Sequence, residues 1–459
     1  MLRDEYDVSG QWQTTQTQGP AGSSLPAGDA VLRPGAHAAP AAEGKAGRRA
    51  WHWERWLVRR LWQWAGSPPV AVKLFGGHSV TPPAKEAVPA IHIKDRPALW
   101  KLFVDPLFQF GELYMHGRLE TEGDLADVLE RVFRGLEKRF HPGRMGWRWL
   151  LQPVNTLTRS RANAAHHYDL GNDFYRKWLD DQMVYTCAYF PRPGMTIEEA
   201  QVAKMEHVCR KLRLAPGMTV LEAGCGWGAL ALHMARHYGV HVTAYNVSRE
   251  QIAFARERAR REGLADRVTF VDDDWRNMRG SFDRFVSVGM LEHVGPPNYR
   301  LLGKVVACCL KSNGLGLIHS IGRNYAAPVN AWIRKYIFPG GYAPSLREMT
   351  AIFEPFNFSI LDVENIRLHY AETLQHWRKR FEKVWDEVVQ QFGETFARMW
   401  RFYLCCSQAA FQTGGLQLFQ VVFAHGSNNS IPQTREDIYR RAALTADKAR
   451  SASEQGVDA

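Results

Sequence analysis

The segment VLEAGCGWG, residues 220–228, constrains the fold of this 459-residue chain more than any other. A short apolar run with the pattern of a strand leads into three glycines at alternate positions, and a helical pattern follows from Leu230 to Tyr238. Glycines at a strand-to-helix turn let a ligand approach the backbone closely. This segment therefore predicts a doubly wound fold with a ligand site at the turn.

Strand and helix patterns alternate after this turn. We expect strands over 240–245, 268–271 and 285–288, and a helix over 250–262. Such alternation is typical of βαβ units and predicts a parallel sheet. The catalytic domain is expected over residues 166–426.

The spacing of the glycines bears on the ligand. Gly224, Gly226 and Gly228 form GxGxG, which favours S-adenosylmethionine over the GxGxxG spacing of dinucleotide enzymes. Glu222 adds an acidic group at the end of the strand. A dinucleotide site and a purely structural turn remain as alternatives.

Composition divides the rest of the chain. We expect a disordered tail over 1–50, a basic Trp-rich amphipathic helix over 51–68, a small α+β domain over 69–135, a basic linker over 136–165, and a polar C-terminal tail over 427–459. The amphipathic helix carries a stripe of Trp53, Leu57, Leu61 and Trp64 beside several arginines. Two interpretations compete: the helix binds an anionic membrane surface, or it packs its stripe on the next domain.

Charge and cysteine content narrow the class of protein. The formal net charge of +11 favours an acidic partner, either anionic lipid or nucleic acid. Charged residues interrupt every apolar run, so we expect no membrane-spanning helix. The seven cysteines show no paired CxxC spacing, which predicts reduced thiols, no structural metal and a cytoplasmic location.

Several ordered motifs carry a resemblance. They are GELYMHGRLETEGDL at 111–125, HHYDLGNDFYRKWLDDQMVYTCAYF at 166–190, VLEAGCGWG at 220–228, EHVGPPNY at 292–299, IHSIG at 318–322, WIRKYIFPGGYAPS at 332–345 and LQLFQVVFAHG at 416–426. Over residues 70–426 the chain resembles the cyclopropane-fatty-acyl-phospholipid synthase family. The resemblance implies an α/β fold: a class I methyltransferase (Rossmann-like) sheet with a smaller α+β N-terminal domain.

The resemblance also implies a reaction. In such enzymes the double bond of a phospholipid acyl chain takes the methyl carbon of S-adenosylmethionine, and the resulting cation loses a proton to close a cyclopropane ring. A bound bicarbonate ion is the implied base. The matched cage positions are Cys187, Glu292, His319, Ile321 and Tyr370, with Cys187 and Ile321 acting through backbone groups. Taken singly, Cys187 and His319 could equally be core residues.

Matched cofactor positions follow the carboxyl ends of successive strands. They are Gly224, Gly226, Asn246, Ser248, Gln251, Asp274, Trp275 and Arg276, and Tyr185 is a further matched cofactor position that precedes these strands. The family more often has Thr where Asn246 stands and Tyr where Trp275 stands. Both replacements conserve the polar or aromatic character of the side chain, so we expect cofactor binding to survive.

Aromatic residues recur in the same motifs. Tyr168, Tyr185, Tyr189, Phe190, Trp332, Tyr336 and Phe338 could stabilise a sulfonium or carbocation by cation–π attraction, or could simply pack in the core. Trp332, Ile333, Tyr336 and Ile337 share a helical face opposite Arg334 and Lys335. That face would suit the entrance for an acyl chain beneath phosphate headgroups.

Three other functions compete with ring formation. A C-methyltransferase would leave methyl, methylene or furan-precursor branches from the same cation. A lipid-binding protein without catalysis conflicts with the complete cage, and an RNA methyltransferase lacks a clear single-strand stacking module. The expected partner is therefore a phospholipid bilayer with unsaturated chains, bound peripherally at the inner face of the membrane. No nucleic acid is expected, and a homodimer stays open.

Overall fold

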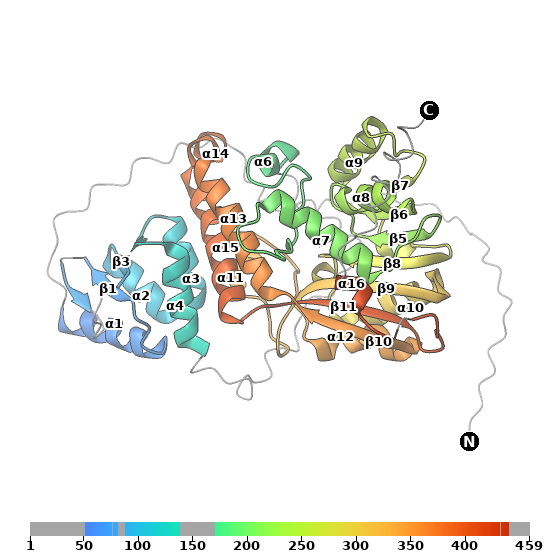
Figure 1. The fold of residues 1–459 in the computed structure, drawn as a ribbon. Helices are drawn as coiled ribbons and strands as arrows, with labels where there is room; N and C mark the ends of the chain where they lie inside the picture. Colours follow the sequence, from blue (N-terminus) through green and yellow to red (C-terminus); the bar gives the residue numbers. More distant parts are fainter. Residues whose placement is uncertain (1–50, 76, 81–87, 138–169, 432, 440–459) are drawn as a thin grey trace, which may run out of the picture. The chain divides into compact units, whose positions relative to one another are not determined.

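The computed structural model describes residues 51–75, 77–80, 88–137, 170–431 and 433–439 (Figure 1). The predicted tail over 1–50, most of the predicted linker, the end of the C-terminal tail and Tyr168 lie outside the described residues. Two sheets organise the described part of the chain.

The first sheet has four strands in the order β2-β1-β3-β4. Its strands are β1 (Ala71–Leu74), β2 (Ser79–Val80), β3 (Ala90–Ile93) and β4 (Leu119–Glu122), and its helices are α1 (His52–Trp64), α2 (Arg96–Val104), α3 (Pro106–Met115) and α4 (Leu125–Glu137). Asp95 and Asp105 cap α2 and α3, each followed by a proline in the first turn. A mixed pairing results, with β1 parallel to β3 and antiparallel to β2.

Helix α1 packs one face on this unit, and that face includes part of the predicted stripe. Leu57 and Val58 are buried, and buried Glu54 pairs with Arg96 of α2 at 2.5 Å. Of the predicted stripe, Leu57 is buried whereas Trp53 is 48% exposed, so the stripe is divided between the packed face and the outer face.

The second sheet has seven strands in the order β10-β11-β9-β8-β5-β6-β7. The strands are β5 (Thr219–Ala223), β6 (His241–Asn246), β7 (Val268–Asp272), β8 (Phe282–Val288), β9 (Leu310–Gly322), β10 (Phe358–Asn365) and β11 (Gln417–His425). The α-helices are α6 (Asn172–Arg176), α7 (Ile197–Lys211), α8 (Ala229–Tyr238), α9 (Arg249–Arg261), α10 (Tyr299–Cys309), α11 (Ala331–Tyr336), α12 (Leu346–Phe353), α13 (Arg367–Lys383), α14 (Trp385–Phe392), α15 (Glu394–Thr413) and α16 (Glu436–Tyr439). Short 3₁₀ turns are η3 (Trp275–Asn277), η4 (Leu291–His293), η5 (Pro296–Asn298) and η6 (Glu354–Phe356).

Strand direction corrects one prediction. Strands β5 to β9 are parallel as expected, but β11 runs antiparallel to both of its neighbours, β9 and β10. The sheet is therefore mixed. The reason is the helical excursion α13 to α15, which returns the chain between β10 and β9 in the opposite direction.

Alternate residues of the central strands enter different cores. Val220 and Val286 pack with the residues of α8 and α9, whereas Leu221 and Phe285 pack with those of α10 and α12. Successive side chains of a strand point to opposite faces, so both faces of the sheet are covered by helices.

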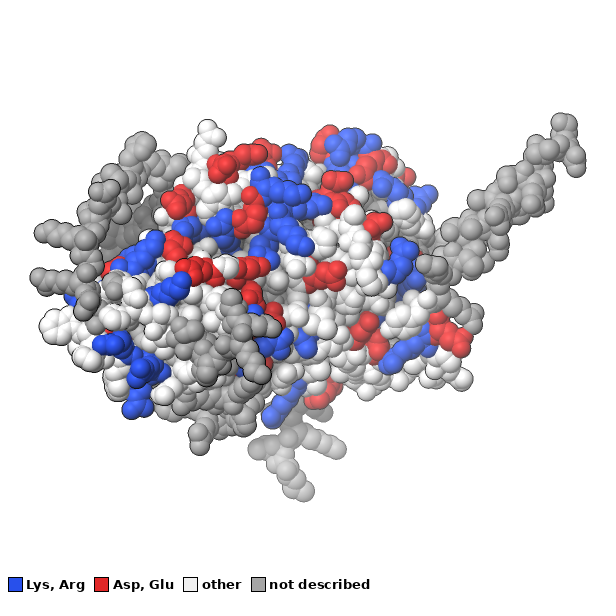
Figure 2. All heavy atoms as spheres, turned by 60° about the vertical axis from the view of Figure 1, so that its left-hand side comes forward, with Lys and Arg blue, Asp and Glu red and all other residues white. Residues whose placement is uncertain are grey.

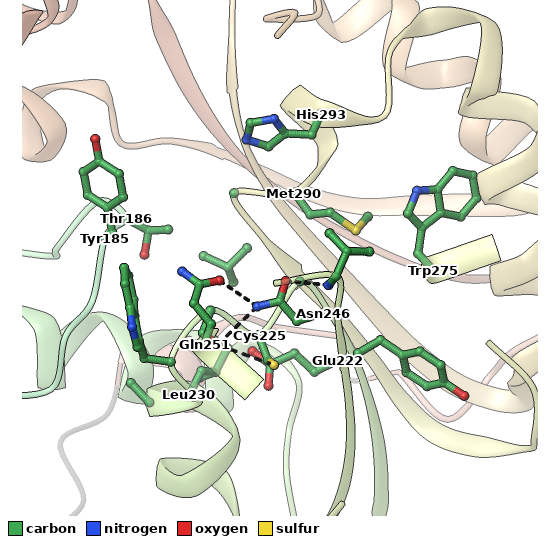
Figure 3. Close-up of a pocket in the computed structure, with 18 of the residues that line it drawn as sticks. Tyr185, Thr186, Glu222, Cys225, Leu230, Asn246, Gln251, Trp275, Met290 and His293 are labelled. Carbon is green, nitrogen blue, oxygen red and sulfur yellow. Dashed lines mark hydrogen bonds between the residues drawn. The ribbon is translucent and has the colours of Figure 1, made fainter. Parts of the chain in front are cut away.

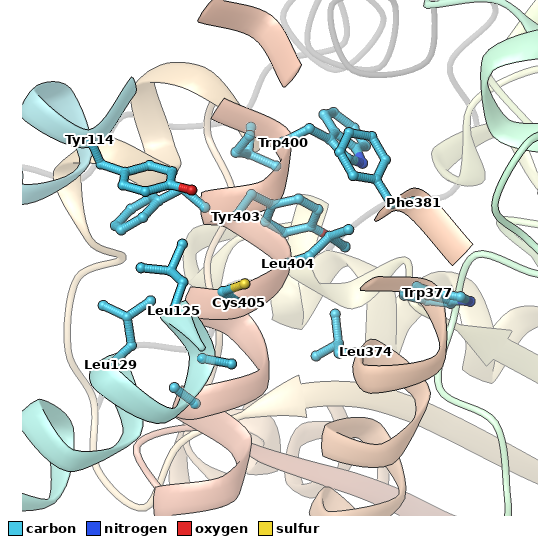
Figure 4. Close-up of a cluster of buried hydrophobic side chains, with 14 of the residues drawn as sticks. Tyr114, Leu125, Leu129, Leu374, Trp377, Phe381, Trp400, Tyr403, Leu404 and Cys405 are labelled. Atoms are coloured by element: carbon cyan, nitrogen blue, oxygen red, sulfur yellow. The ribbon is translucent and has the colours of Figure 1, made fainter. Parts of the chain in front are cut away.

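A third core joins the two sheet units through α15 (Figure 4). Leu125 and Leu129 of α4 lie on one side of Cys405 of α15, and Leu374 and Trp377 of α13 lie on the other. Helix α15 is thus buried on opposite faces, and it connects the small N-terminal unit to the helices beside the large sheet.

Candidate active site

The glycine turn between β5 and α8 requires glycine at each of its three positions. Gly224, Gly226 and Gly228 have φ values of +83°, +54° and +84°, which side chains rarely adopt. A Cβ atom at Gly224 would lie 2.8 Å from Met290 Cβ, and one at Gly228 would lie 2.7 Å from Phe270 Cζ. A Cβ at Gly226 would meet nothing within 4 Å. The middle glycine therefore borders open space, where a ligand can reach the backbone.

A pocket opens at this turn (Figure 3). Seven of the nine predicted cofactor residues line it: Tyr185, Gly224, Gly226, Asn246, Gln251, Asp274 and Trp275. The other two contact residues that line the pocket. Ser248 caps α9 by accepting the Gln251 N–H at 3.5 Å, and Arg276 pairs with Asp274 at 2.9 Å.

Hydrogen bonds fix the polar wall of the pocket. Asn246 Nδ2 donates to Gln251 Oε1 at 2.7 Å and to the Gly226 carbonyl at 3.3 Å. The Arg276 guanidinium lies 4.6 Å from the centre of the Trp275 ring. The loop after β6 is therefore tied to the glycine turn, and the side chains of the loop after β7 contact one another.

The sequence predictions missed several groups on the same wall. Thr186, Lys204, Met290 and His293 line the pocket, and none of them was assigned a role from the sequence. Lys204 lies among the buried residues of the helix over 197–211, and its place at the pocket follows from the fold and not from a sequence motif. His293 is a neutral imidazole, because burial lowers its pKa to about 4.

Glu292 lies in η4, next to the pocket-lining residues of the same segment. Its Oε1 atom accepts the Ile321 N–H at 2.6 Å, so two of the five predicted cage residues are in direct contact. Its Oε2 atom is buried and has no hydrogen-bond partner among the described residues. Burial raises the pKa of Glu292 to about 7, against the opposing effect of the Ile321 N–H.

His319 lies two residues before Ile321 on β9 and is 2% exposed. Burial and the charge of Lys204 lower its pKa to about 3, so the ring is neutral. Gln420 Nε2 on the adjacent strand lies 3.1 Å from His319 Nδ1. This contact ties the imidazole ring on β9 to the neighbouring strand β11.

Cys187 and Tyr370 come from two further elements. The Cys187 side chain is fully buried and donates to the Ala188 carbonyl at 3.0 Å, and burial raises the pKa of its thiol far above the ordinary value. It is therefore a protonated thiol, unsuited to a nucleophilic role. Tyr370 on α13 stacks on Phe411 with ring centres 4.5 Å apart.

The predicted aromatic residues do not form a single lining. Of those in the described ranges, only Tyr185 borders the pocket. Tyr189 stacks on His207 at 4.3 Å, and Trp332 is buried against Phe402 of α15 at 4.7 Å. Core packing is thus the observed role of Trp332.

Comparisons with known proteins identify the family of this chain. A family model described as mycolic acid cyclopropane synthetase matches residues 155–421. The chain is 44% identical to the cyclopropane-fatty-acyl-phospholipid synthase of Escherichia coli over 351 residues, which cover 75% of this chain and 90% of that protein. It is 35% identical to a probable fatty acid methyltransferase of Pseudomonas putida, over 81% of this chain and 96% of that protein.

Solved structures give the same assignment. A cyclopropane synthase from Mycobacterium tuberculosis superposes with a TM-score of 0.55 at 28% identity, covering 57% of this chain and 98% of its own. A mycolic acid cyclopropane synthase in complex with SAH and CTAB superposes with a TM-score of 0.55 at 29% identity, covering 60% and 99%. The predicted class I methyltransferase fold and the predicted family resemblance are confirmed. This chain belongs to the mycolic acid cyclopropane synthetase family of S-adenosylmethionine-dependent methyltransferases.

Proposed function

We propose that this chain transfers the methyl carbon of S-adenosylmethionine to the double bond of an unsaturated phospholipid acyl chain and closes a cyclopropane ring. The position of Glu292 is the observation that carries this proposal. Gly289, Met290 and His293 line the cofactor pocket, and the same segment holds the buried carboxyl with its unpartnered oxygen. Ring closure requires removal of a proton beside the site of methyl transfer, and a buried polar group there serves that step.

The reaction has two bond-making steps. One alkene carbon bonds to the methyl carbon as the bond between the methyl carbon and sulfur breaks. The acyl-chain cation then loses a proton from the former methyl group, and the electrons of that C–H bond close the ring. The pocket wall of Tyr185, Asn246, Gln251, Asp274 and Trp275 would hold the cofactor, whose contribution is an electrophilic methyl group.

We infer that Glu292 and His319, two of the predicted cage residues, would hold a small oxyanion. The Ile321 N–H donates to Oε1 of Glu292, and Oε2 would remain available to such an ion. A carboxyl with a pKa of about 7 is partly protonated at neutral pH and can donate a hydrogen bond. His319 would contribute a ring nitrogen of a neutral imidazole. Bicarbonate, when bound there, supplies a base near the reacting carbons. Together, Glu292 and His319 would orient that base without adding a competing nucleophile.

Proton NMR of the product lipid tests the proposal. Purified chain, S-adenosylmethionine and vesicles of an unsaturated phospholipid are expected to give upfield cyclopropane signals. Vinylidene or branched-methyl signals would instead favour a C-methyltransferase, an alternative supported by the similarity to a probable fatty acid methyltransferase. Absence of transfer to any unsaturated lipid would contradict both activities.

We further propose that α1 brings the enzyme to the surface of an anionic bilayer. No helix in the described part of the chain could span a membrane. The outer face of α1 instead presents Trp53 and Trp56, which are 48% and 52% exposed, beside the exposed residues Arg59 and Arg60. Trp at the headgroup level and Arg on anionic lipid are typical of an interfacial helix.

Attraction to a membrane depends on local charge, because acidic and basic side chains are mixed on the surface. On the face drawn in Figure 2, Lys and Arg side chains are interspersed with Asp and Glu, so attraction to a membrane depends on local groups such as those of α1. Each basic residue near an anionic surface contributes about 1 kcal/mol. Arg59→Ala/Arg60→Ala is therefore expected to weaken sedimentation with anionic vesicles at low salt by about tenfold or more.

The matched control removes two arginines of α4 from the same unit. Arg131 and Arg134 pair with Asp127 and Glu130, so their replacement with Ala should have little effect on vesicle binding. Equal losses in both variants would show a general charge effect. Unchanged binding of the α1 variant would assign α1 a packing role only.

A further inference from the structure

Lys204 is a buried cation that the proposed reaction does not use. It lies on α7, is 2% exposed and lines the cofactor pocket. Its ammonium donates to Thr186 Oγ1 at 3.1 Å. A lysine ammonium carries three N–H donors, and the other two have no hydrogen-bond partner in the described part of the chain.

The acidic groups around Lys204 do not neutralise it directly. Asp180 accepts the backbone N–H groups of Gln182 and Val184, both at 2.9 Å. Glu222 at the end of β5 is 2% exposed, and its Oε2 atom is buried without a partner. Within the described ranges no ion pair shorter than 4 Å joins Lys204 to either carboxyl. Burial of an ammonium group without a paired anion is costly in free energy, unless a bound ligand supplies that anion.

The two unmatched groups have opposite character and border the same pocket. Burial lowers the pKa of Lys204 to about 8 and raises that of Glu222 to about 8, while their mutual attraction opposes both shifts. The methionyl end of S-adenosylmethionine is a zwitterion with an α-carboxylate and an α-ammonium group. A pocket with one buried cation and one buried carboxyl is complementary to such a ligand.

The layout of the pocket agrees with this polarity. In Figure 3, Thr186 lies on the opposite side of the pocket from Trp275. A Cβ atom at Gly289 would lie 2.9 Å from Thr186 Cγ2, so the Thr186 side adjoins the segment that leads to Glu292. The adenosine end of S-adenosylmethionine would then lie on the side of the pocket that Trp275 lines. The methyl group lies next to the methionyl end in the cofactor, as transfer near Glu292 requires.

We propose that Lys204 binds the α-carboxylate of S-adenosylmethionine, with Thr186 orienting its ammonium group. This inference rests on the cofactor of the proposed function and is independent of the acyl chain and of the product. It assigns to α7, which precedes the glycine turn in the chain, a direct part in cofactor recognition.

A mutant and ligand cycle tests the assignment. Calorimetry measures the Kd of S-adenosylhomocysteine and of its decarboxylated analogue, which keeps the amino group, for the full chain and for Lys204→Met. In the wild type, loss of the ligand carboxylate should weaken binding by on the order of 10²-fold. In Lys204→Met the two ligands should bind with Kd values within about threefold of each other, because no cation remains to distinguish them.

Equal weakening of both ligands by the substitution would overturn the proposal, since it would show that Lys204 supports the fold of the pocket instead. Lys204→Gln is the second variant if Lys204→Met does not fold, and it carries the same expectation. Lys211→Met is the matched control. Lys211 is buried on the same helix but pairs with Glu364 at 2.5 Å, so its removal should preserve the 10²-fold preference for the carboxylate. The assay measures binding alone, and a failure of ring formation would not affect it.

Discussion

Single buried residues near the pocket have pKa values that are shifted in favour of the neutral form. Burial keeps His293 and His319 neutral and raises the pKa values of Glu222 and Glu292. Such shifts have a cost in folding stability, because the folded state opposes the charge that the unfolded chain would adopt. Clustering of perturbed groups around one pocket is typical of a functional site.

Glu222 gives a measurable consequence of this cost. Its pKa is about 8 in the folded chain and 4.5 ordinarily, so the folded state binds the proton more tightly. The stabilisation is complete below pH 4.5 and is lost progressively as pH rises to 8. Melting temperatures of Glu222→Gln and wild type, measured without cofactor, should therefore diverge in favour of the variant between pH 5 and 8. A difference that does not change with pH would contradict the assigned shift.

The residues of the site were predictable to different degrees. The glycines, Asn246 and Trp275 follow strands in recognisable motifs, so their place on the pocket wall could be predicted. Lys204 lies on a helix before the glycine turn, and only the fold brings it to the pocket. Sequence spacing cannot show a contact between elements that far apart.

The glycine turn packs closely against neighbouring side chains at Gly228 and borders the ligand pocket at Gly226. Substitutions at these two glycines should therefore affect stability and ligand binding to different degrees. Gly228→Ala would place Cβ 2.9 Å from Ala255 Cβ and close to the Phe270 ring, whereas Gly226→Ala would point into open space. Both positions carry the strain of a positive φ, about 1 kcal/mol or more. We expect Gly228→Ala to lower the melting temperature by several degrees more than Gly226→Ala.

If both variants fold, affinity for S-adenosylhomocysteine should be reduced more by Gly226→Ala than by Gly228→Ala. Calorimetry is expected to give a larger loss for Gly226→Ala, because its added methyl group occupies the space beside the backbone that the ligand approaches. Equal melting temperatures for the two variants, or tighter binding by Gly226→Ala, would contradict this account of the turn.

Elements were easier to predict than their directions. The expected strands over 240–245 and 268–271 agree with β6 and β7 to within one residue. The antiparallel course of β11 was not predicted, because periodicity reports which residues are buried and not which way a strand runs. Periodicity also gave no indication that Glu54 of α1 is buried in an ion pair with Arg96.

At the scale of the whole described molecule, α3 and α11 connect the small sheet unit to the catalytic unit. Gly111 of α3 packs so closely on Trp332 of α11 that an added Cβ would lie 2.7 Å from the indole nitrogen. Helix propensity alone predicts that Gly→Ala stabilises a helix by about 1 kcal/mol. The contact predicts the opposite sign for this position.

Gly111→Ala is therefore expected to lower the melting temperature and to reduce turnover on vesicles, with affinity for S-adenosylhomocysteine unchanged because the cofactor pocket lies on other elements. Gln109→Ala on the same helix is the control and should leave the melting temperature within about a degree. A Gly111→Ala variant with a higher melting temperature than the wild type would contradict the close packing of α3 on α11.

The central claim is that Glu292 serves ring closure beside an intact cofactor pocket. The most direct measurement is the initial rate of cyclopropane formation, followed by proton NMR, for Glu292→Gln and wild type, with calorimetric affinity for S-adenosylhomocysteine alongside. The rate should fall by about 10²- to 10⁴-fold, as is typical when a group that serves proton transfer is removed, while affinity stays within about threefold. Glu206→Gln, which removes a carboxyl paired with Arg210 on α7, should retain the wild-type rate. Full activity of Glu292→Gln, or equal losses of rate and cofactor affinity, would contradict the claim.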